Sequence, residues 1–565
     1  MKINNLYKGM AALLTAASLA SCSSDYLQLD PITIVDETTV MHSTKNAQLA
    51  LYGICRSMYM GYSVGSDVQF LNGEPWYNTF YGEVFAEDAF YYLWGQRGGV
   101  FLRGDNLMVS DYWFPQMAYM YPYNLISQAN KILQYIDDAE GSEAERSFIK
   151  AQTLTMRAHG YVKLLQLFAP RWEDSNNGAK MTNIVLRTEF STGDAPLADM
   201  NTVLKLVCDD LDEAIRLYGE SGLKRTYRYE PDIEVARGLY ARTAMIKHDW
   251  STAREMAKAA RANYPVMTAE EYMDGFSEPT GEWMWCNALD EEDSYMGYFS
   301  WGALYACNGT YVYTWGFGSG AINYDTYLHM DENDTRRALY WTPDKPLMRP
   351  LTKASFWNSA YVDAATMNMN LTNEVGQPNL MSTLINGYSA NRMPGNDISR
   401  FDIKAYCNSG NESATITGIV PFGAQYKFWG QGAYSNSTYP FMRGSEMALI
   451  EAEAAYMDQD EAAAKAALTE VNKNRITDYV CSTSGDALLD EIRWSRRIEL
   501  WGEGFNFSDL KRWNMPMVRR AWVEGDVTSN NIPANLATTV LPSEHDGWTI
   551  VVPATEYEYN ADITK

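Results

Sequence analysis

The chain has 565 residues and a formal net charge of −25, from 46 Lys and Arg against 71 Asp and Glu. Hydrophobic residues make up 46% and charged residues 21%, a globular composition that excludes general disorder. The acidic balance argues against a nucleic-acid-binding protein, since such proteins carry basic stripes. Aromatic residues reach 13%, with Tyr the most frequent at 39 copies. Tyr joins apolar area to a polar tip, so this excess suits a wet binding surface.

The first residues predict export and a lipid anchor. Lys2 and Lys8 accompany an apolar run over residues 9–20, which is shorter than the roughly 20 residues of a membrane-spanning helix. The charge and length of this segment are typical of a secretory signal. Its end, LASC, resembles a bacterial lipobox, so we expect a signal peptide over residues 1–21 and lipid attachment at Cys22. The alternative is an ordinary signal peptide followed by an unrelated cysteine.

Apolar residues at helical spacing predict helices near 44–60 and 123–139 and over 154–168. Two longer patterns, over 233–260 and 447–471, are each interrupted by a short break, at 249–250 and at 458–460. Two helices joined in this way, with small Ala residues at their contacts, resemble the helical hairpins of tetratricopeptide repeats. We therefore predict a mainly α protein with a tetratricopeptide-like helical-hairpin scaffold over about 40–265 and 443–512.

The segment from about 266 to 440 has a different texture. It is rich in Gly, Asn, Ser, Tyr and Trp, and it carries turn signals at 308–309, 386–387 and 394–395. No long helical pattern continues through it, so we expect loops with short strands packed on the helical scaffold. Because helical parts flank this segment on both sides, we predict that the mature chain, 22–565, forms one composite domain.

Cysteine and histidine give little sign of metal or redox chemistry. The seven Cys include no CxxC pair, and the five His are isolated, with no HExxH motif. We predict mostly free, buried thiols and structural histidines, with no metal and no cofactor. The acidic segment 331–334 raises the possibility of calcium but lacks the Gly and distal Glu of an EF-hand loop. Helix capping ahead of Arg336 and Arg337 is the favoured interpretation.

Several sequence blocks fit one family pattern. They are the acylated Cys22, the hairpin that opens with ARGLYAR at 236–242, the segment 443–475 with LIEAEA and VNKNR, the block 496–513 with RRIELWGEGF and DLKRW, and a chain end with Val552-Pro553, Glu556 and Asn560. Together these blocks resemble the SusD/RagB family of Bacteroidetes outer-membrane lipoproteins, over nearly the whole mature chain. The 496–513 block is the most specific of them.

The resemblance implies a SusD-like fold and a non-catalytic binding protein at the outer membrane, facing the cell exterior. Such a protein lies as a lid on a TonB-dependent transporter of the SusC type and delivers oligomers to it, usually glycans. A RagB-like member of the same architecture would bind peptides instead. Two alternatives from other classes stay open, a surface glycoside hydrolase and a purely structural lipoprotein.

The residues of the 496–513 block have a structural interpretation of their own. Charged side chains of both signs alternate with apolar ones, which predicts ion pairs at a seam between helices. Glu499 and Glu503 are four residues apart, so we expect them on one helix face. Paired carboxylates are also what a glycosidase needs. The neighbouring Arg residues should lower the pKa of both acids and prevent general-acid chemistry, so we predict no catalytic residues.

Aromatic residues concentrate in two windows, which hold 17 rings over 70–123 and 15 rings over 283–341. Sugars present flat C–H faces, which rings cover, and hydroxyl groups, which polar side chains bind. The first window contains Trp94 in a glycine-rich segment that predicts an exposed loop; the second has a turn signal at Asn308. The predicted glycan-binding residues are Trp94, Tyr91, Tyr92, Trp301, Tyr305, Asn308, Tyr311 and Trp315. The alternative for any single ring is that it fills an irregular core.

Overall fold

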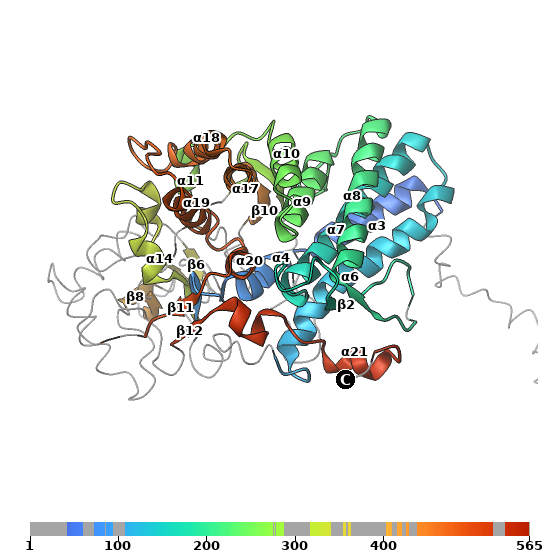
Figure 1. The fold of residues 1–565 in the computed structure, drawn as a ribbon, viewed down its shortest axis with the longest axis horizontal. Helices are drawn as coiled ribbons and strands as arrows, with labels where there is room; N and C mark the ends of the chain where they lie inside the picture. The colour runs from blue at the N-terminus through green and yellow to red at the C-terminus, as the bar shows by residue number, and fades with distance from the viewer. Residues whose placement is uncertain are drawn as a thin grey trace, which may run out of the picture.

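In the computed structural model, two groups of helices lie next to each other, with short strands at one end (Figure 1). The structure describes residues 42–59, 73–93 without 85, 108–287 without 192, 275 and 277, 317–340, 438–521, 523 and 537–563. Between 341 and 437 it describes the strands at 354–356, 360–362, 403–408 and 415–420 and residues 425, 427 and 428.

The first group of helices is built around one buried helix. Its members are α3 (Thr44–Ser57), α6 (Trp113–Tyr135), α7 (Glu143–Phe168), α8 (Met200–Ser221), α9 (Ile233–Ile246) and α10 (Trp250–Ala260). Helix α7 contacts α3, α6, α8 and α9, and nearly all of its residues after Phe148 are buried. A Ser142–Glu145 capping box fixes its start. The predicted apolar face at 154–168 is confirmed, and burial extends beyond that face to the other sides of α7.

Both predicted helical hairpins are confirmed. Asp249 caps α10 and Asp460 caps α18 (Glu461–Asn472), so each polar break in the sequence is the start of the second helix of a hairpin. Ala253, Ala257 and Ala260 are completely buried on α10, where small side chains let neighbouring helices approach. The scaffold is therefore the expected array of helical pairs.

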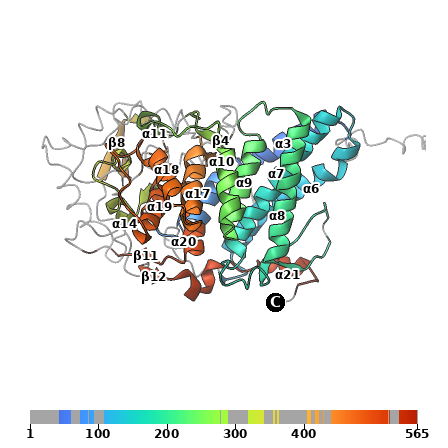
Figure 2. The ribbon, with the colours of Figure 1, turned by 45° about the horizontal axis from the view of Figure 1, so that its top comes forward.

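The second group of helices continues the first. It consists of α17 (Gly444–Met457), α18, α19 (Asp486–Glu499) and α20 (Asn506–Trp513). Helix α17 contacts α9 and α10 on one side and α18 and α19 on the other. Figures 1 and 2 both show this row, with α17 between α19 and the pair formed by α9 and α10. The two groups thus share one continuous helical array.

The described strands form small antiparallel sheets. The pairs are β1 (Ala89–Leu93) with β5 (Phe317–Ile322), β2 (Met181–Val185) with β3 (Leu197–Asp199), β4 (Trp283–Cys286) with β10 (Pro440–Arg443), and β11 (Met517–Arg519) with β12 (Thr538–Val540). A four-stranded sheet has the order β6 (Ala354–Phe356), β7 (Ala360–Val362), β8 (Ile403–Asn408) and β9 (Thr415–Val420). The helices and these few short strands confirm the predicted mainly α fold class with a strand-and-loop part.

Short helical segments connect these elements. They are α4 (Glu74–Tyr77), which runs into a π-helical segment over Asn78–Val84, α11 (Ala269–Met273), α14 (Tyr324–Leu328) and α21 (Ala554–Tyr559), with 3₁₀ turns at Ile136–Asp138, Thr335–Leu339, Pro542–Glu544 and Asp546–Trp548. Pro122 lies inside α6, which begins ten residues before the helix expected near 123–139. The aromatic residues ahead of Pro122 hid the start of α6 from a periodicity analysis, because nearly all of that stretch is apolar.

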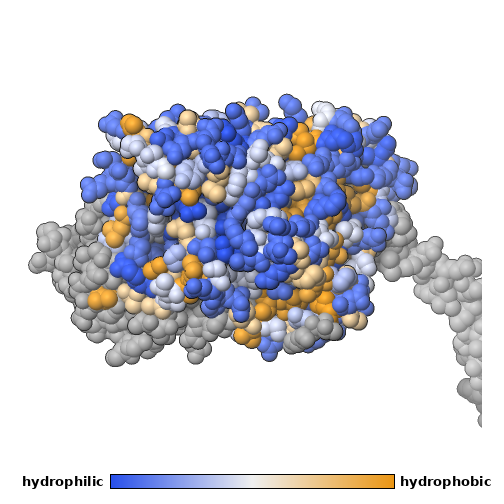
Figure 3. Space-filling view, in the orientation of Figure 1, coloured by the Kyte–Doolittle hydropathy of each residue, from blue (hydrophilic) through white to orange (hydrophobic). Residues whose placement is uncertain are grey.

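The outer surface agrees with the acidic composition. The face seen in Figure 3 is largely hydrophilic, and apolar residues gather on it near β2 and the adjacent part of α6. No helix within the described ranges is long and apolar enough to cross a membrane.

Candidate functional site

The 496–513 block forms the centre of a buried ion-pair cluster. Glu499, at the end of α19, accepts hydrogen bonds from Arg475 at 3.0 Å and from Arg336 at 2.8 Å. Arg443 reaches Glu499 at 3.2 Å, Glu503 at 2.7 Å and Glu282 at 2.7 Å. All six of these residues are at least 95% buried. We call the set of Glu282, Asp334, Arg336, Lys427, Arg443, Arg475, Glu499 and Glu503 the junction cluster.

The junction cluster confirms the predicted ion pairs but corrects one detail. Glu499 and Glu503 do not share a helix face, because α19 ends at Glu499 and Glu503 lies in the following turn. Gly502 and Gly504 have φ values of 78° and 92°, which favour glycine and turn the chain there. The two carboxylates still meet, because Arg443 binds both.

The electrostatics of these two acids do not suit general-acid catalysis. Burial alone would raise the pKa of Glu499, but Arg475, Arg443 and Arg336 outweigh it and hold that pKa well below its ordinary value. The pKa of Glu503 is also lowered, because Arg443 and Lys427 outweigh its burial. Both groups therefore remain carboxylates bound to guanidinium groups, and their role is structural.

A second set of buried contacts joins α19 to the start of β1. Arg497 binds Asp88, with Nε 2.9 Å from Oδ2, and also binds Glu87. The indole Nε1 of Trp501 donates to the Asp88 carbonyl at 2.7 Å. Asp88 immediately precedes Ala89, the first residue of β1. The block at 496–513 therefore fixes where β1 begins.

The β1/β5 ladder brings together the two aromatic windows of the sequence. Ala89 pairs with Ile322 and Leu93 pairs with Phe317, so the end of β1 lies beside the start of β5. Trp94 directly follows Leu93 in the chain, and Trp315 lies two residues before Phe317. Leu93 and Phe317, more than 200 positions apart in the sequence, thus form one end of this ladder.

The predicted site residues themselves are not placed. Tyr91 and Tyr92 belong to β1 by their backbone, and their side chains are outside the description. Trp94, Trp301, Tyr305, Asn308, Tyr311, Trp315 and the lipid-attachment residue Cys22 lie outside the described residues. All of these assignments remain predictions.

Many of the described rings of both windows follow the core alternative. Trp76, Tyr77, Tyr81, Trp283 and Trp285 are all at most 4% exposed. Tyr77 and Tyr81 donate to the carbonyls of Ala118 and Phe114, so their polar tips are satisfied inside the protein. A large part of the aromatic excess therefore fills the core, and sequence alone could not separate these rings from exposed ones.

The remaining metal and cysteine expectations can be checked in the described part of the chain. Asp334 caps the 3₁₀ turn Thr335–Leu339 and binds Arg336, so the capping interpretation of segment 331–334 is confirmed. The described ranges contain no group of three or more His, Cys, Asp or Glu side chains able to hold a metal. Cys55 and Cys286 are free and buried, and Cys208 and Cys481 are free and half-buried.

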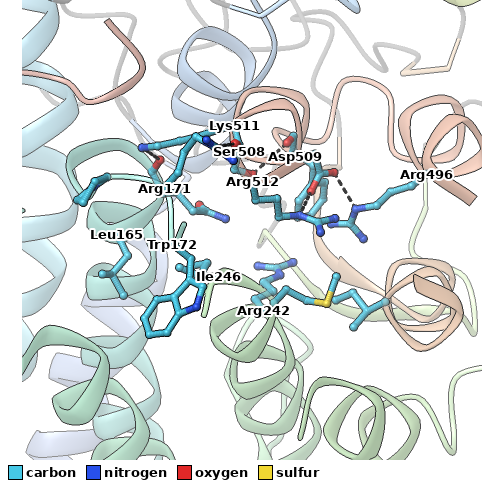
Figure 4. A pocket seen from close by; sticks show the side chains of 15 residues that line it. Leu165, Arg171, Trp172, Arg242, Ile246, Arg496, Ser508, Asp509, Lys511 and Arg512 are labelled. Atoms are coloured by element: carbon cyan, nitrogen blue, oxygen red, sulfur yellow. Dashed lines mark hydrogen bonds and ion pairs between the residues drawn. The ribbon is translucent and has the colours of Figure 1, made fainter. Parts of the chain in front are cut away.

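Sequence reasoning missed a hollow among α7, α9 and α20 (Figure 4). It encloses about 50 Å³ of space for small-molecule atoms and is partly open to solvent. It is lined by Leu165, Gln166, Pro170, Arg171, Trp172, Arg242, Met245, Ile246, Ile450, Arg496, Phe505, Ser508, Asp509, Lys511 and Arg512. Figure 4 shows the guanidinium groups of Arg242, Arg496 and Arg512 directed toward one another from three different helices. The one sequence feature that could have indicated this hollow is the density of basic residues in 496–513, which the ion-pair interpretation left unexamined as a ligand site.

The helical hairpins form a row, and a part with loops and short strands packs on it. This arrangement is typical of a class of proteins in which a helical solenoid supports a loop-and-strand part. Known families narrow this class. A model of the SusD family matches residues 266–561, and one described as starch-binding associating with outer membrane matches 69–242. The first match alone covers 296 of the 565 residues, so this chain belongs to the SusD family.

Solved structures agree with this fold. A SusD-like carbohydrate-binding protein from Bacteroides vulgatus is 18% identical, with a TM-score of 0.67, and the match covers 92% of this chain and 97% of that one. A protein from the same organism described as sugar-binding is 19% identical, with a TM-score of 0.65 and coverage of 93% and 98%. Surface glycan-binding protein A from Bacteroides thetaiotaomicron is 15% identical, with a TM-score of 0.59 and coverage of 92% and 98%. No curated protein matches this chain.

Proposed function

We propose that this chain is a non-catalytic, cell-surface glycan-binding lipoprotein. It captures oligosaccharides or polysaccharide and delivers them to a SusC-like TonB-dependent transporter. The lipid on Cys22 anchors it to the outer membrane, with the binding surface toward the cell exterior. Membership of the SusD family and the glycan-binding descriptions of structures with the same fold support this proposal.

The observation that carries the glycan site is the β1/β5 ladder. Its Leu93–Phe317 end is the point from which both ring-rich segments extend. Arg497 and Trp501 hold the residues just before β1 through buried bonds to Asp88. A rigid ladder can present loops at a fixed place, as binding sites on loops require.

In this proposal the rings form the floor of the site. Trp94 is the main stacking surface, supported by Tyr91 and Tyr92 from the same window. Trp301, Tyr305, Tyr311 and Trp315 come from the second window, and the amide of Asn308 binds sugar hydroxyls. Rings give contact area at little cost in side-chain entropy. Such a shallow site predicts affinities of roughly micromolar to millimolar Kd, because sugar hydroxyls are well solvated before binding.

Binding and point variants test the glycan site. The mature protein is screened by calorimetry against a broad set of poly- and oligosaccharides, and the best ligand is then titrated into Trp94→Ala and into the double variant Trp301→Ala/Trp315→Ala. Each variant should bind at least tenfold more weakly while its Tm stays within about 2 °C of the parent. Tyr559→Ala is the matched control, because Tyr559 is an 82% exposed ring on α21, far along the chain from both windows. Unchanged affinity in Trp94→Ala would remove Trp94 from the site.

Further experiments on the same mature protein distinguish glycan binding from the other candidate functions. If no saccharide binds but a peptide library does, the cargo is peptide and the glycan proposal fails. If the bound glycan is shortened on overnight incubation, the chain is a hydrolase, against the structural role that we assign to Glu499 and Glu503. For the anchor, Cys22→Ala should release the protein from the outer membrane into the soluble fraction. For the partner, an affinity tag on the anchored protein should co-purify a transporter of the SusC type.

A further inference from the structure

The hollow of Figure 4 differs from the junction cluster in how its cations are paired. The junction cluster contains four cations and four carboxylates, each cation bonded to at least one carboxylate. The hollow has five cations on its wall: Arg242, Arg496 and Lys511 are buried, and Arg171 and Arg512 are half-buried. The four arginines each pair with at least one carboxylate, whereas no carboxylate among the described residues bonds to Lys511.

Arg496 is the cation with unused donors. Its Nε donates to Asp509 at 2.7 Å, and Asp509 is shared with Arg512 at 2.9 Å. Arg496 is 4% exposed, yet its buried Nη1 has no hydrogen-bond partner in the described part of the protein. A buried donor without an acceptor is costly, and an unpaired one on a cation more so. Arg242, by contrast, uses Nε and Nη2 in a bidentate pair with Glu446.

Lys511 supplies a second, independent sign of a missing anion. Its Nζ donates to the carbonyls of Gln166 and Ala169 at the end of α7, at 3.0 and 2.6 Å, and within the described ranges no carboxylate bonds to it. Burial first, and then the positive charge of Arg171, lower the pKa of Lys511 to about 7. An anion in the hollow would relieve this repulsion.

We propose that this hollow is a second ligand site, distinct from the glycan surface, and that it binds the carboxylate of a small organic acid. The unpaired Nη1 of Arg496 calls for an acceptor, and the planar fork of a guanidinium matches a carboxylate. Ile450, Phe505 and Met245 give the hollow an apolar wall for the body of the ligand. Trp172 and Ile246, both half-buried, line the same hollow on the side opposite Arg496 in Figure 4, where an indole can cover a ring face. The carboxylate could come from a uronic acid unit of an acidic glycan or from a free organic acid.

The test uses the mature full-length chain and four probes at constant ionic strength: sodium D-glucuronate, D-glucose, sodium acetate and sodium sulfate. Glucuronate should bind with a Kd of roughly millimolar and raise the Tm. Acetate should compete with it, while glucose should not. If glucuronate binds tenfold more tightly than acetate, the source is a uronic acid; equal binding indicates any free organic acid. Both results support a carboxylate site.

Two variants locate the binding. Arg496→Gln removes the unpaired guanidinium and should weaken glucuronate binding at least tenfold. Because it also breaks the bond to Asp509 and could impair folding, Ser508→Leu is the second variant. Ser508 lines the hollow, is half-buried and belongs to no ion pair, so a larger side chain there occupies the hollow while every ion-pairing residue is kept. Ser508→Leu should abolish the Tm shift by glucuronate and leave saccharide binding at the loop surface unchanged.

Arg216→Gln is the matched control, since Arg216 is an exposed arginine on α8 that does not line the hollow. It should bind glucuronate like the parent. The proposal is overturned if neither carboxylate binds, if Ser508→Leu binds both as well as the parent, or if sulfate displaces glucuronate as strongly as acetate does. None of these results would touch the glycan proposal, which depends on Trp94 and its neighbours.

Discussion

The bundle of α6, α7 and α8 is held together mainly by apolar contacts, with one buried Arg157–Asp210 ion pair, whereas buried charges dominate the junction around Arg443. Helix α8 buries Val203, Val207, Leu211, Ala214 and Tyr218 at helical spacing, next to α7. The junction instead buries four cations and four carboxylates that come from β10, α19, the 3₁₀ turn Thr335–Leu339 and several loops. Apolar contacts are non-directional, whereas a buried ion pair is weak evidence of net stability and requires one geometry.

The difference shows where each force is needed. In the bundle a repeated pattern is sufficient, because regular helices can pack through any complementary apolar face. At the junction, segments with no repeat must meet in one arrangement, and Arg443 alone contacts Glu282, Glu499 and Glu503. Directional contacts select that arrangement, and through Arg497 and Asp88 they also fix the ladder on which the proposed glycan site depends.

The largest effect is expected at Arg443. Arg443→Met should lower the free energy of unfolding by about 5 kcal/mol or more, because three buried carboxylates lose a partner and Met cannot replace the bonds. Arg443→Lys keeps the charge but not the fork, so its loss should be smaller. The Tm of each variant is measured by calorimetry. If Arg443→Met and Arg443→Lys melt at the parental temperature, the junction does not depend on this cluster.

A substitution in the helical bundle should lower the free energy of unfolding by less than Arg443→Met does. Leu211→Ala removes a completely buried side chain from α8, and the expected loss is about 3 kcal/mol, from lost burial and the cavity left behind. Urea unfolding of the variant checks this value. Leu211→Met is the control, because it nearly conserves volume and should cost under about 1.5 kcal/mol. The comparison between the two regions fails if Leu211→Ala is more damaging than Arg443→Met.

The sequence predicted the regular region well, because periodicity and caps are local. The hairpin breaks at Asp249 and Asp460 are helix caps, readable from a few neighbouring residues. Helix α6 began earlier than expected, since the rings before Pro122 mask any period. The ion pairs of 496–513 could be expected from composition.

The partners in the junction could not be predicted from the sequence. Glu282, Arg336 and Arg475 reach Glu499 or Arg443 from positions far apart in the chain, and no local pattern specifies such contacts. The four-residue spacing of Glu499 and Glu503 misled, because α19 ends at Glu499 and Gly502 turns the chain before Glu503. The hollow is of the same kind, because Arg242 and Arg496 come to line it only when α9 and α19 pack on either side of α17. Exposure of the predicted rings likewise depends on tertiary packing.

Glu83, a buried carboxyl group, should make the free energy of unfolding depend on pH, which tests the contribution of buried charge by a second route. Its Oε1 accepts from the Gly504 and Phe505 amides, and Oε2 has no partner among the described residues. Burial, and then Asp88, raise the pKa of Glu83 to about 8. The folded protein therefore binds a proton that the unfolded chain has released above its ordinary pKa near 4.5. This stabilisation is fully present below about pH 4.5 and is lost as the pH rises to about 8.

The variant Glu83→Gln should remove this contribution. The stability of the parent relative to Glu83→Gln should fall by about 1.4 kcal/mol per pH unit between pH 5 and 7.5. Urea unfolding at several pH values measures the difference. Glu213→Gln, an exposed acid on α8, is the control and should give no such slope. Parallel pH profiles for parent and Glu83→Gln would mean that Glu83 is already ionised in the folded protein.

The smallest effect is expected at Arg216, which has the same side chain as Arg443 in the opposite setting. It pairs with Glu213 at 2.6 Å and Glu220 at 2.5 Å on the outside of α8, and its side chain is 51% exposed. Water and salt screen such pairs, so Arg216→Gln should change the free energy of unfolding by less than about 1 kcal/mol. The difference should shrink further in 1 M salt, where the screening length is about 3 Å. A loss comparable to that of Arg443→Met would show that burial and geometry do not set the value of an ion pair in this protein. A change in the free energy of unfolding near zero would show that ion pairs matter for this fold where they are buried, at the junction.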